Sequence, residues 1–140
     1  DSRLQSLVLA LEAVAEELPV IWPVHPRIKE SVKSSVLRLT QPFGYIDMQC
    51  LIKNAQVVLT DSGGMQKEAF FHKVPCITLR EETEWVELVA SGWIHLAGAT
   101  DTDHILDKLH TALKGVEHLK VGDWYGKGDA AKRIAEVLLR

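Results

Sequence analysis

The chain has 140 residues and a formal net charge of −3, with acidic and basic residues mixed along its length. That length predicts one domain over residues 1–140, and the lack of a basic patch argues against nucleic acid as a partner. No apolar run approaches the roughly 18–20 residues of a membrane span, so we expect no membrane partner. Cys50 and Cys76 lie in apolar contexts without metal-ligand spacing, which predicts no metal site and favours a reducing, cytoplasmic setting.

The first part of the chain alternates between helix-type and strand-type patterns. Apolar residues recur at helical spacing from Leu4 to Leu18, which predicts an amphipathic helix. Pro19 follows directly and is expected to end it. A short β-type run and a weakly helical segment come next. The elements predicted in this part are a helix over 2–18, a strand over 19–24, a helix over 27–36, a strand over 36–40 and a helix over 45–55.

The rest of the chain repeats the alternation. Thr83 and Gly92 are typical of a helix start and a helix stop, and a turn-rich stretch over 121–129 precedes the last helix. This order indicates an α/β fold built from parallel βαβ units with helices on both faces. The elements predicted here are a strand over 56–60, a helix over 64–73, a strand over 75–79, a helix over 83–92, a strand over 93–98, and helices over 102–115 and 130–140.

Parallel sheets bind ligands beyond the carboxyl ends of their strands. Ser62, Gly63 and Gly64 occupy such a place, between a predicted strand and a predicted helix. A helix N-terminus exposes unpaired N–H groups with partial positive charge, and glycines let a phosphate approach them. About one turn on, Glu68 can accept hydrogen bonds from two ribose hydroxyls. Arg80 ends the next strand, and its guanidinium suits phosphate oxygens. The pattern therefore indicates a nucleoside diphosphate cradle.

Two other interpretations of this stretch stay open. Ser-Gly-Gly after a strand can be only a tight turn with a helix cap. A serine between a strand and a helix is also typical of a hydrolase nucleophile, although Thr60 stands where that motif has glycine and no histidine is fixed near Ser62. The stretch matches neither GxGxxG nor a Walker A loop, which argues against the usual dinucleotide and ATP sites.

Several longer motifs extend through the chain. They are PVHPR (23–27), YIDM (45–48), TDSGG (60–64), MQKEA (65–69), TLREETE (78–84) and YGKGDAAKRI (125–134). With them the chain resembles the non-hydrolysing UDP-N-acetylglucosamine 2-epimerases over nearly its whole length. The resemblance implies a Rossmann-like domain, the C-terminal half of a two-domain fold similar to the B-type glycosyltransferases.

The resemblance also implies a reaction and roles for single residues. These epimerases invert carbon 2 of the sugar by eliminating UDP to a glycal and adding it back, without a cofactor. UDP and a UDP-amino sugar are thus the implied partners. Ser62, Gly63 and Gly64 match the residues that hold the diphosphate. Glu68 matches the carboxylate on the ribose, and Arg80 matches an arginine near the diphosphate.

Three further residues take roles from the resemblance. Met48 falls where the family often has Phe beside the uracil, and Glu84 matches an acid with a supporting role. His25 lies where some bacterial members contact a second, regulatory UDP-sugar, although the common His-x-Asn-Pro is here His-Pro-Arg. The stretch TEWVE (83–87) resembles the subgroup that acts on UDP-linked 2,3-diacetamido-uronic acid sugars, so the substrate need not be plain N-acetylglucosamine.

The family's acids and bases for the carbon 2 proton come mainly from the first domain, which is missing here. We therefore expect the catalytic residues in that missing domain, an inactive fragment, and a homodimer when full length. The implied pathway is polysaccharide biosynthesis for the cell envelope. In the family a central strand precedes the helix over 2–18, and this sequence lacks it. We expect that another chain or a rearranged segment fills its place, or that strands 19–24 and 56–60 pair directly.

Two alternative functions remain: a UDP-sugar glycosyltransferase domain, which shares the fold and the cradle, and a stand-alone nucleotide-sugar sensor. The aromatic residues add little to this choice. Trp22, Trp85 and Trp93 lie in apolar patterns and are expected in the core. Trp124 and Tyr125 stand in a glycine-rich turn and are candidates for the rim of a cleft.

Overall fold

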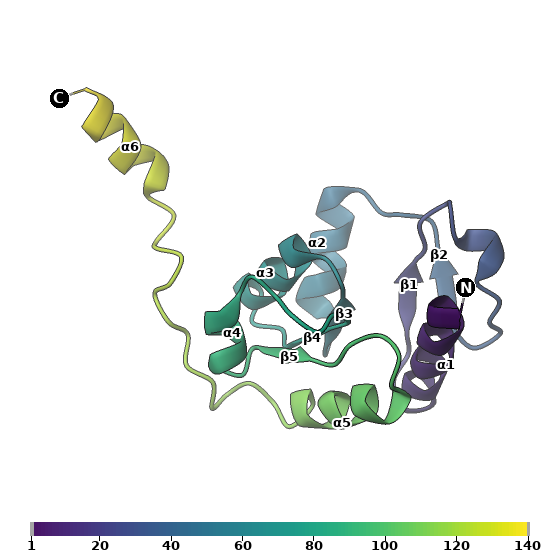
Figure 1. The fold of residues 1–140 in the computed structure, drawn as a ribbon. Coiled ribbons are helices and arrows are strands. Elements are labelled where there is room, and N and C mark those ends of the chain that lie inside the picture. The colour runs from purple at the N-terminus through teal and green to yellow at the C-terminus, as the bar shows by residue number, and fades with distance from the viewer. Residues whose placement is uncertain (1, 140) are drawn as a thin grey trace.

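The computed structural model describes the backbone of residues 2–139 and the side chains of residues 4–139. Helices and strands alternate along the chain, as predicted (Figure 1). The helices are α1 (Ser2–Glu17), α2 (Tyr45–Asn54), α3 (Gly63–Phe71), α4 (Val86–Ala90), α5 (Thr102–Ala112) and α6 (Ala130–Leu138). The strands are β1 (Ile21–Pro23), β2 (Arg38–Thr40), β3 (Val58–Thr60), β4 (Cys76–Thr78) and β5 (Ile94–Leu96). The predicted end of the last helix at Arg140 lies outside the described residues.

All strand pairs in the described chain are parallel, and they form two separate sheets. One pairs β1 with β2, and the other has the order β3-β4-β5. In the larger sheet Thr60 is level with Thr78, and Thr78 is level with Leu96. The three carboxyl ends therefore meet at one edge, and the loops that follow β3 and β4 start side by side.

Helices cover both faces of the larger sheet, and the side chains of β4 show how. Cys76 packs into a cluster with residues of α2, α3 and α4. Ile77 points the other way, into a cluster with residues of α1 and α5, because successive side chains of a strand alternate between its faces. Burial raises the pKa of the Cys76 thiol to about 12, so this cysteine is an inert core residue.

The two sheets meet without a shared strand. The expectation that β1 and β3 pair directly, or that a rearranged segment joins them, is wrong for residues 2–139, because no backbone hydrogen bond links the two strands. Val20 and Leu59 instead pack against the core clusters on both sides of this boundary. Apolar side chains can close such a gap by burial alone, whereas the facing strand edges stay unpaired.

Two predicted helices are shorter than expected. The helix over 27–36 is only a 3-10 turn, Lys29–Ser31. Val32 ends it with extended backbone and is buried, and the serines and valines around it have low helix propensity. The helix over 83–92 begins at Val86 because the residues before it make side-chain contacts with α3. Gly92 has φ +84° and ends it as predicted.

Helix α6 stands apart from the sheets at the end of an extended segment (Figure 1). None of its residues is buried, and its apolar side chains Ile134, Val137 and Leu138 are largely exposed. Among residues 2–139, no helix is both long enough and apolar enough to cross a membrane.

Candidate functional site

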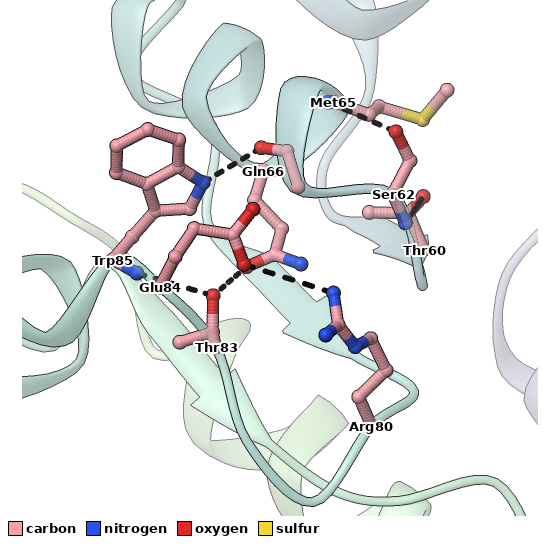
Figure 2. A network of polar contacts seen from close by, with 9 residues as sticks. Thr60, Ser62, Met65, Gln66, Arg80, Thr83, Glu84 and Trp85 are labelled. Carbon is pink, nitrogen blue, oxygen red and sulfur yellow. Dashed lines mark hydrogen bonds and ion pairs between the residues drawn. The ribbon is translucent and has the colours of Figure 1, made fainter.

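The loop from β3 to α3 is held by its own side chains. Thr60, the last residue of β3, is buried, and its hydroxyl oxygen accepts a hydrogen bond from the Ser62 N–H at 3.1 Å. Ser62 is the N-cap of α3, and its hydroxyl oxygen accepts from the Met65 N–H at 3.4 Å. Figure 2 shows both contacts at the start of the helix. The predicted cap therefore forms, and it satisfies one of the free N–H groups of the first turn.

The two glycines at the start of α3 face different surroundings. Gly64 is exposed, and a Cβ built there would meet only the Ser62 hydroxyl, at 3.9 Å. A Cβ on Gly63 would overlap the carboxylate of Glu84. The backbone at Gly64 is thus open to solvent, as the cradle requires, whereas the absence of a side chain at Gly63 makes room for Glu84.

Glu84 brings a negative charge to the N-terminus of α3, and Arg80 pairs with it. The Arg80 Nη1 atom lies 3.7 Å from the Glu84 Oε2 atom, and the two side chains are 41% and 49% exposed. A pair this open adds at most about 1 kcal/mol to stability. A carboxylate is favoured at this end of a helix, which carries partial positive charge. The same two groups, helix start and guanidinium, are those expected to bind an external anion.

The loop before α4 is tied to α3 by contacts that the sequence did not predict. The Thr83 hydroxyl donates to the Gln66 Oε1 atom at 2.6 Å, and the Trp85 indole N–H donates to the Gly63 carbonyl oxygen at 2.8 Å (Figure 2). Gln66 is fully buried. A polar residue at an otherwise apolar position of a helix was the available signal, since buried amides need partners. Nothing in the spacing identified Thr83 as that partner.

The other predicted site residues lie further from the α3 N-terminus. Glu68 is half-buried on α3, one turn beyond Gly64. Met48 is half-buried on α2 and packs against the core. His25 follows β1, in the other sheet, where its exposed ring accepts a hydrogen bond from the Arg27 N–H at 3.2 Å. The structure thus groups Ser62, Gly63, Gly64, Arg80 and Glu84 tightly, and it places His25 at the end of a different sheet.

An aromatic group supports α3 from its side. The Tyr125 hydroxyl donates to the Glu87 Oε1 atom at 2.5 Å, and this bond lowers the pKa of Glu87. Burial, and after it the same bond, raises the pKa of Tyr125. The Lys67 ammonium lies 4.5 Å from the centre of the Trp85 ring and 4.2 Å from that of Tyr125. These contacts fix the helix and the following loop relative to each other.

The rim expected at Trp124 and Tyr125 stays a prediction for the UDP cleft; Tyr125 lines a surface hollow together with Phe71 and Val121. The Trp124 and Tyr125 rings both pack on Phe70, with centroids 5.9 and 5.7 Å away. Phe70 lies in the last turn of α3, at the end opposite the glycines. Trp93 is buried and Trp22 and Trp85 are half-buried against the core, so the core prediction holds for all three, with Trp85 making the polar contact described above.

The arrangement can bind an anion with several oxygens. Exposed N–H groups of a glycine start and a guanidinium suit phosphate groups, and the electrostatic attraction is strongest for multiple charge. Among the described side chains, no cluster of three or more His, Cys, Asp or Glu residues is placed to hold a metal ion.

Comparison with known proteins gives one consistent family. The sequence model for UDP-N-acetylglucosamine 2-epimerase matches residues 1–139. A UDP-2,3-diacetamido-2,3-dideoxy-D-glucuronate 2-epimerase from Pseudomonas aeruginosa is 43% identical over 99% of this chain and 40% of its own length. A UDP-N-acetylglucosamine 2-epimerase homolog from Methanococcus maripaludis is 42% identical over 85% of this chain and 35% of its own length.

Solved structures agree with the sequence relatives. The crystal structure of Methanocaldococcus jannaschii UDP-GlcNAc 2-epimerase in complex with UDP-GlcNAc and UDP matches with a TM-score of 0.86 and 31% identity. That match covers 99% of this chain and 41% of the solved one. The chain spans about 40% of the length of the curated Pseudomonas aeruginosa relative.

Proposed function

The chain belongs to the UDP-N-acetylglucosamine 2-epimerase family, and from this premise we propose that it is the UDP-binding part of an enzyme that inverts carbon 2 of a UDP-2-acetamido sugar. The observation that carries the proposal is the start of α3. Ser62 caps it, Gly64 leaves its backbone exposed, and Arg80 reaches toward it from the end of β4. We assign the diphosphate to this place.

The reaction has two halves. A base removes the proton from carbon 2, the freed electron pair forms a double bond between carbons 1 and 2, and the carbon 1–oxygen bond to UDP breaks with its electrons staying on the diphosphate. The glycal then takes back UDP at carbon 1 and a proton on the opposite face of carbon 2. Negative charge grows on the diphosphate while the bond breaks, and the N–H groups of α3 and Arg80 stabilise that charge.

The remaining UDP contacts come from neighbouring elements in this proposal. Glu68 lies one turn beyond Gly64 and accepts hydrogen bonds from the ribose hydroxyls. Met48 packs beside the uracil. His25 stands apart in the second sheet, so a regulatory contact through it requires a second ligand site. The acids and bases for carbon 2 belong to a further domain in a cytoplasmic homodimer.

The identity of the substrate sugar follows from one relative and one sequence stretch. The Pseudomonas aeruginosa relative, 43% identical, is named for UDP-2,3-diacetamido-2,3-dideoxy-D-glucuronate, and the stretch TEWVE agrees with that subgroup. We therefore favour a 2,3-diacetamido-uronic acid sugar over N-acetylglucosamine as the substrate.

Two measurements on the intact protein test the proposal. Calorimetric titration should show UDP binding more tightly than uridine, and Glu68→Gln should weaken UDP and uridine alike while leaving pyrophosphate binding unchanged. NMR in deuterated water should show exchange at carbon 2 for one of the two UDP-sugars. Sugar transfer to an acceptor without carbon 2 exchange would support the glycosyltransferase instead. Product formed by the 140-residue chain alone would contradict the assignment of the acids and bases to another domain.

A further inference from the structure

The indole of Trp85 reaches the first turn of α3 from the loop before α4. Its Nε1–H donates to the Gly63 carbonyl oxygen at 2.8 Å (Figure 2). Trp85 is only half-buried and its ring packs on the edge of the core cluster. Packing alone therefore does not account for the direction of the indole, whose polar edge points at one particular peptide group.

That peptide group joins Gly63 to Gly64. The carbonyl of Gly63 and the N–H of Gly64 belong to one planar, trans unit, so they point in opposite directions and rotate together. Two glycines in succession give this peptide more freedom than any other pair of residues would. This peptide lies in the first turn of α3, and a hydrogen bond on its carbonyl adds to the helix geometry in fixing where the Gly64 N–H points.

We propose that Trp85 is a positioning residue that aims the Gly64 N–H at the diphosphate; this inference rests on the proposed function. Gly64 is exposed and a Cβ there would have only the Ser62 hydroxyl nearby, so an oxygen can approach this amide. The bond also polarises the peptide: an amide whose carbonyl accepts a hydrogen bond becomes a stronger donor through its N–H. Trp85 thus acts on the anion through one intervening peptide, without touching it.

Trp85 is itself held in place by three neighbours. The Lys67 ammonium lies 4.5 Å from its ring centre, and the Tyr125 ring meets its edge at 6.0 Å and 88°. Its backbone N–H donates to the Thr83 hydroxyl at 3.3 Å, and that hydroxyl donates to buried Gln66 at 2.6 Å. Lys67 contacts the indole directly from α3, and Gln66 of α3 is linked to it through Thr83, so contacts from α3 hold the indole beside the helix start.

Trp85→Phe removes the N–H and keeps an aromatic ring for Lys67 and Tyr125. The intact protein should then bind UDP about fivefold more weakly, while its affinity for uridine stays unchanged, since one hydrogen bond is lost from the diphosphate's support. Trp93→Phe is the matched control. Trp93 belongs to the same core cluster, and its indole N–H donates to the Lys120 carbonyl oxygen at 3.1 Å. Losing this hydrogen bond should leave the UDP-to-uridine affinity ratio unchanged.

A second variant guards against a folding defect. Benzothienylalanine at position 85 keeps the two-ring shape and lacks the N–H, and it should lower the UDP-to-uridine ratio as Trp85→Phe does. In 15N-glycine spectra, the UDP-induced shift of the Gly64 amide should also shrink in both variants. An unchanged ratio, or an equal loss in Trp93→Phe, overturns the inference and leaves the proposed function standing. A wild-type protein that does not prefer UDP to uridine overturns both.

Discussion

Helices α3 and α5 each follow a strand of the larger sheet, and their first turns differ in charge. Helix α5 follows β5; its N-cap Asp101 accepts a hydrogen bond from the His104 N–H at 3.0 Å, and Asp103 adds a second carboxylate. Helix α3 follows β3, is capped by the neutral Ser62, and continues with two glycines. The fold supplies a positive helix end at both places. The residues at the cap decide which end can take an anion from solution.

Giving α3 the cap of α5 tests this difference most strongly. Ser62→Asp should keep the helix capped, because aspartate is as good an N-cap as serine. The fixed negative charge should weaken UDP binding by roughly a hundredfold through repulsion of the diphosphate. Calorimetry measures the change. The reciprocal control, Asp101→Ser, should leave UDP binding untouched, and an equal loss in the control would remove the distinction between the two helices.

Removing Arg80 shows what the start of α3 does by itself. Arg80→Ala should weaken UDP binding by about tenfold, since a charge-assisted contact to phosphate is lost. The UDP affinity of Arg80→Lys should lie between those of the wild type and Arg80→Ala, because lysine keeps the charge but lacks the planar guanidinium. The free energy of unfolding should change by at most about 1 kcal/mol, as the Arg80–Glu84 pair is exposed. Wild-type affinity in Arg80→Ala would mean that the guanidinium does not face the ligand.

The cap of α5 should matter for stability alone. Asp101→Ala should lower the free energy of unfolding by about 1 kcal/mol, since the His104 N–H loses its partner. Urea denaturation followed by circular dichroism measures it. Ser62→Ala is the matched variant and should lower the free energy of unfolding by less. The hydrogen bond that Ser62 accepts is longer than that of Asp101, 3.4 Å against 3.0 Å. A larger loss for Ser62→Ala would reverse the assignment of the two caps.

Lowering the pH should destabilise the two faces of the larger sheet at different pH values, and this is the smallest effect that we expect. Burial, with repulsion from Lys108, lowers the pKa of His95 below its ordinary 6.5. The contribution of neutral His95 to stability is present above pH 6.5. It is lost as the pH falls through the lowered pKa of the folded state. On the α3 face, the Tyr125 hydrogen bond lowers the pKa of Glu87 below 4.5, so that contribution disappears only at lower pH. His95→Gln should flatten the first step of a denaturation series and leave the second.

The sequence predicted the β3–α3 junction well because all of its signals are contiguous. A β-type run, a capping serine and two glycines follow one another, and local preferences of the backbone largely determine what they form. The contacts of Thr83 and Trp85 were missed because their partners lie about twenty residues earlier in the chain. Thr83 was interpreted as a helix start and Trp85 as core, which their neighbours in sequence favoured. Tertiary contacts moved the helix start from Thr83 to Val86, and they added a polar contact to Trp85, which still packs against the core.

The arrangement of the sheets shows the same limit on a larger scale. The alternation of strand and helix patterns predicted parallel strands, and they are parallel. Which strands pair depends on contacts between elements far apart in the chain, and no local pattern contains that information. The result is two sheets joined by side chains such as Val20 and Leu59.

Glu84 gives the start of α3 a built-in counterion. A ligand that comes to this place must displace a tethered carboxylate, whose effective concentration there is roughly millimolar or higher. Chloride or acetate would exchange one negative charge for another of the same size and gain nothing. A species with several charges spread over many oxygens recovers more attraction than it gives up. We therefore expect the carboxylate beside Gly63 to favour multiply charged anions over monovalent ones at the start of α3.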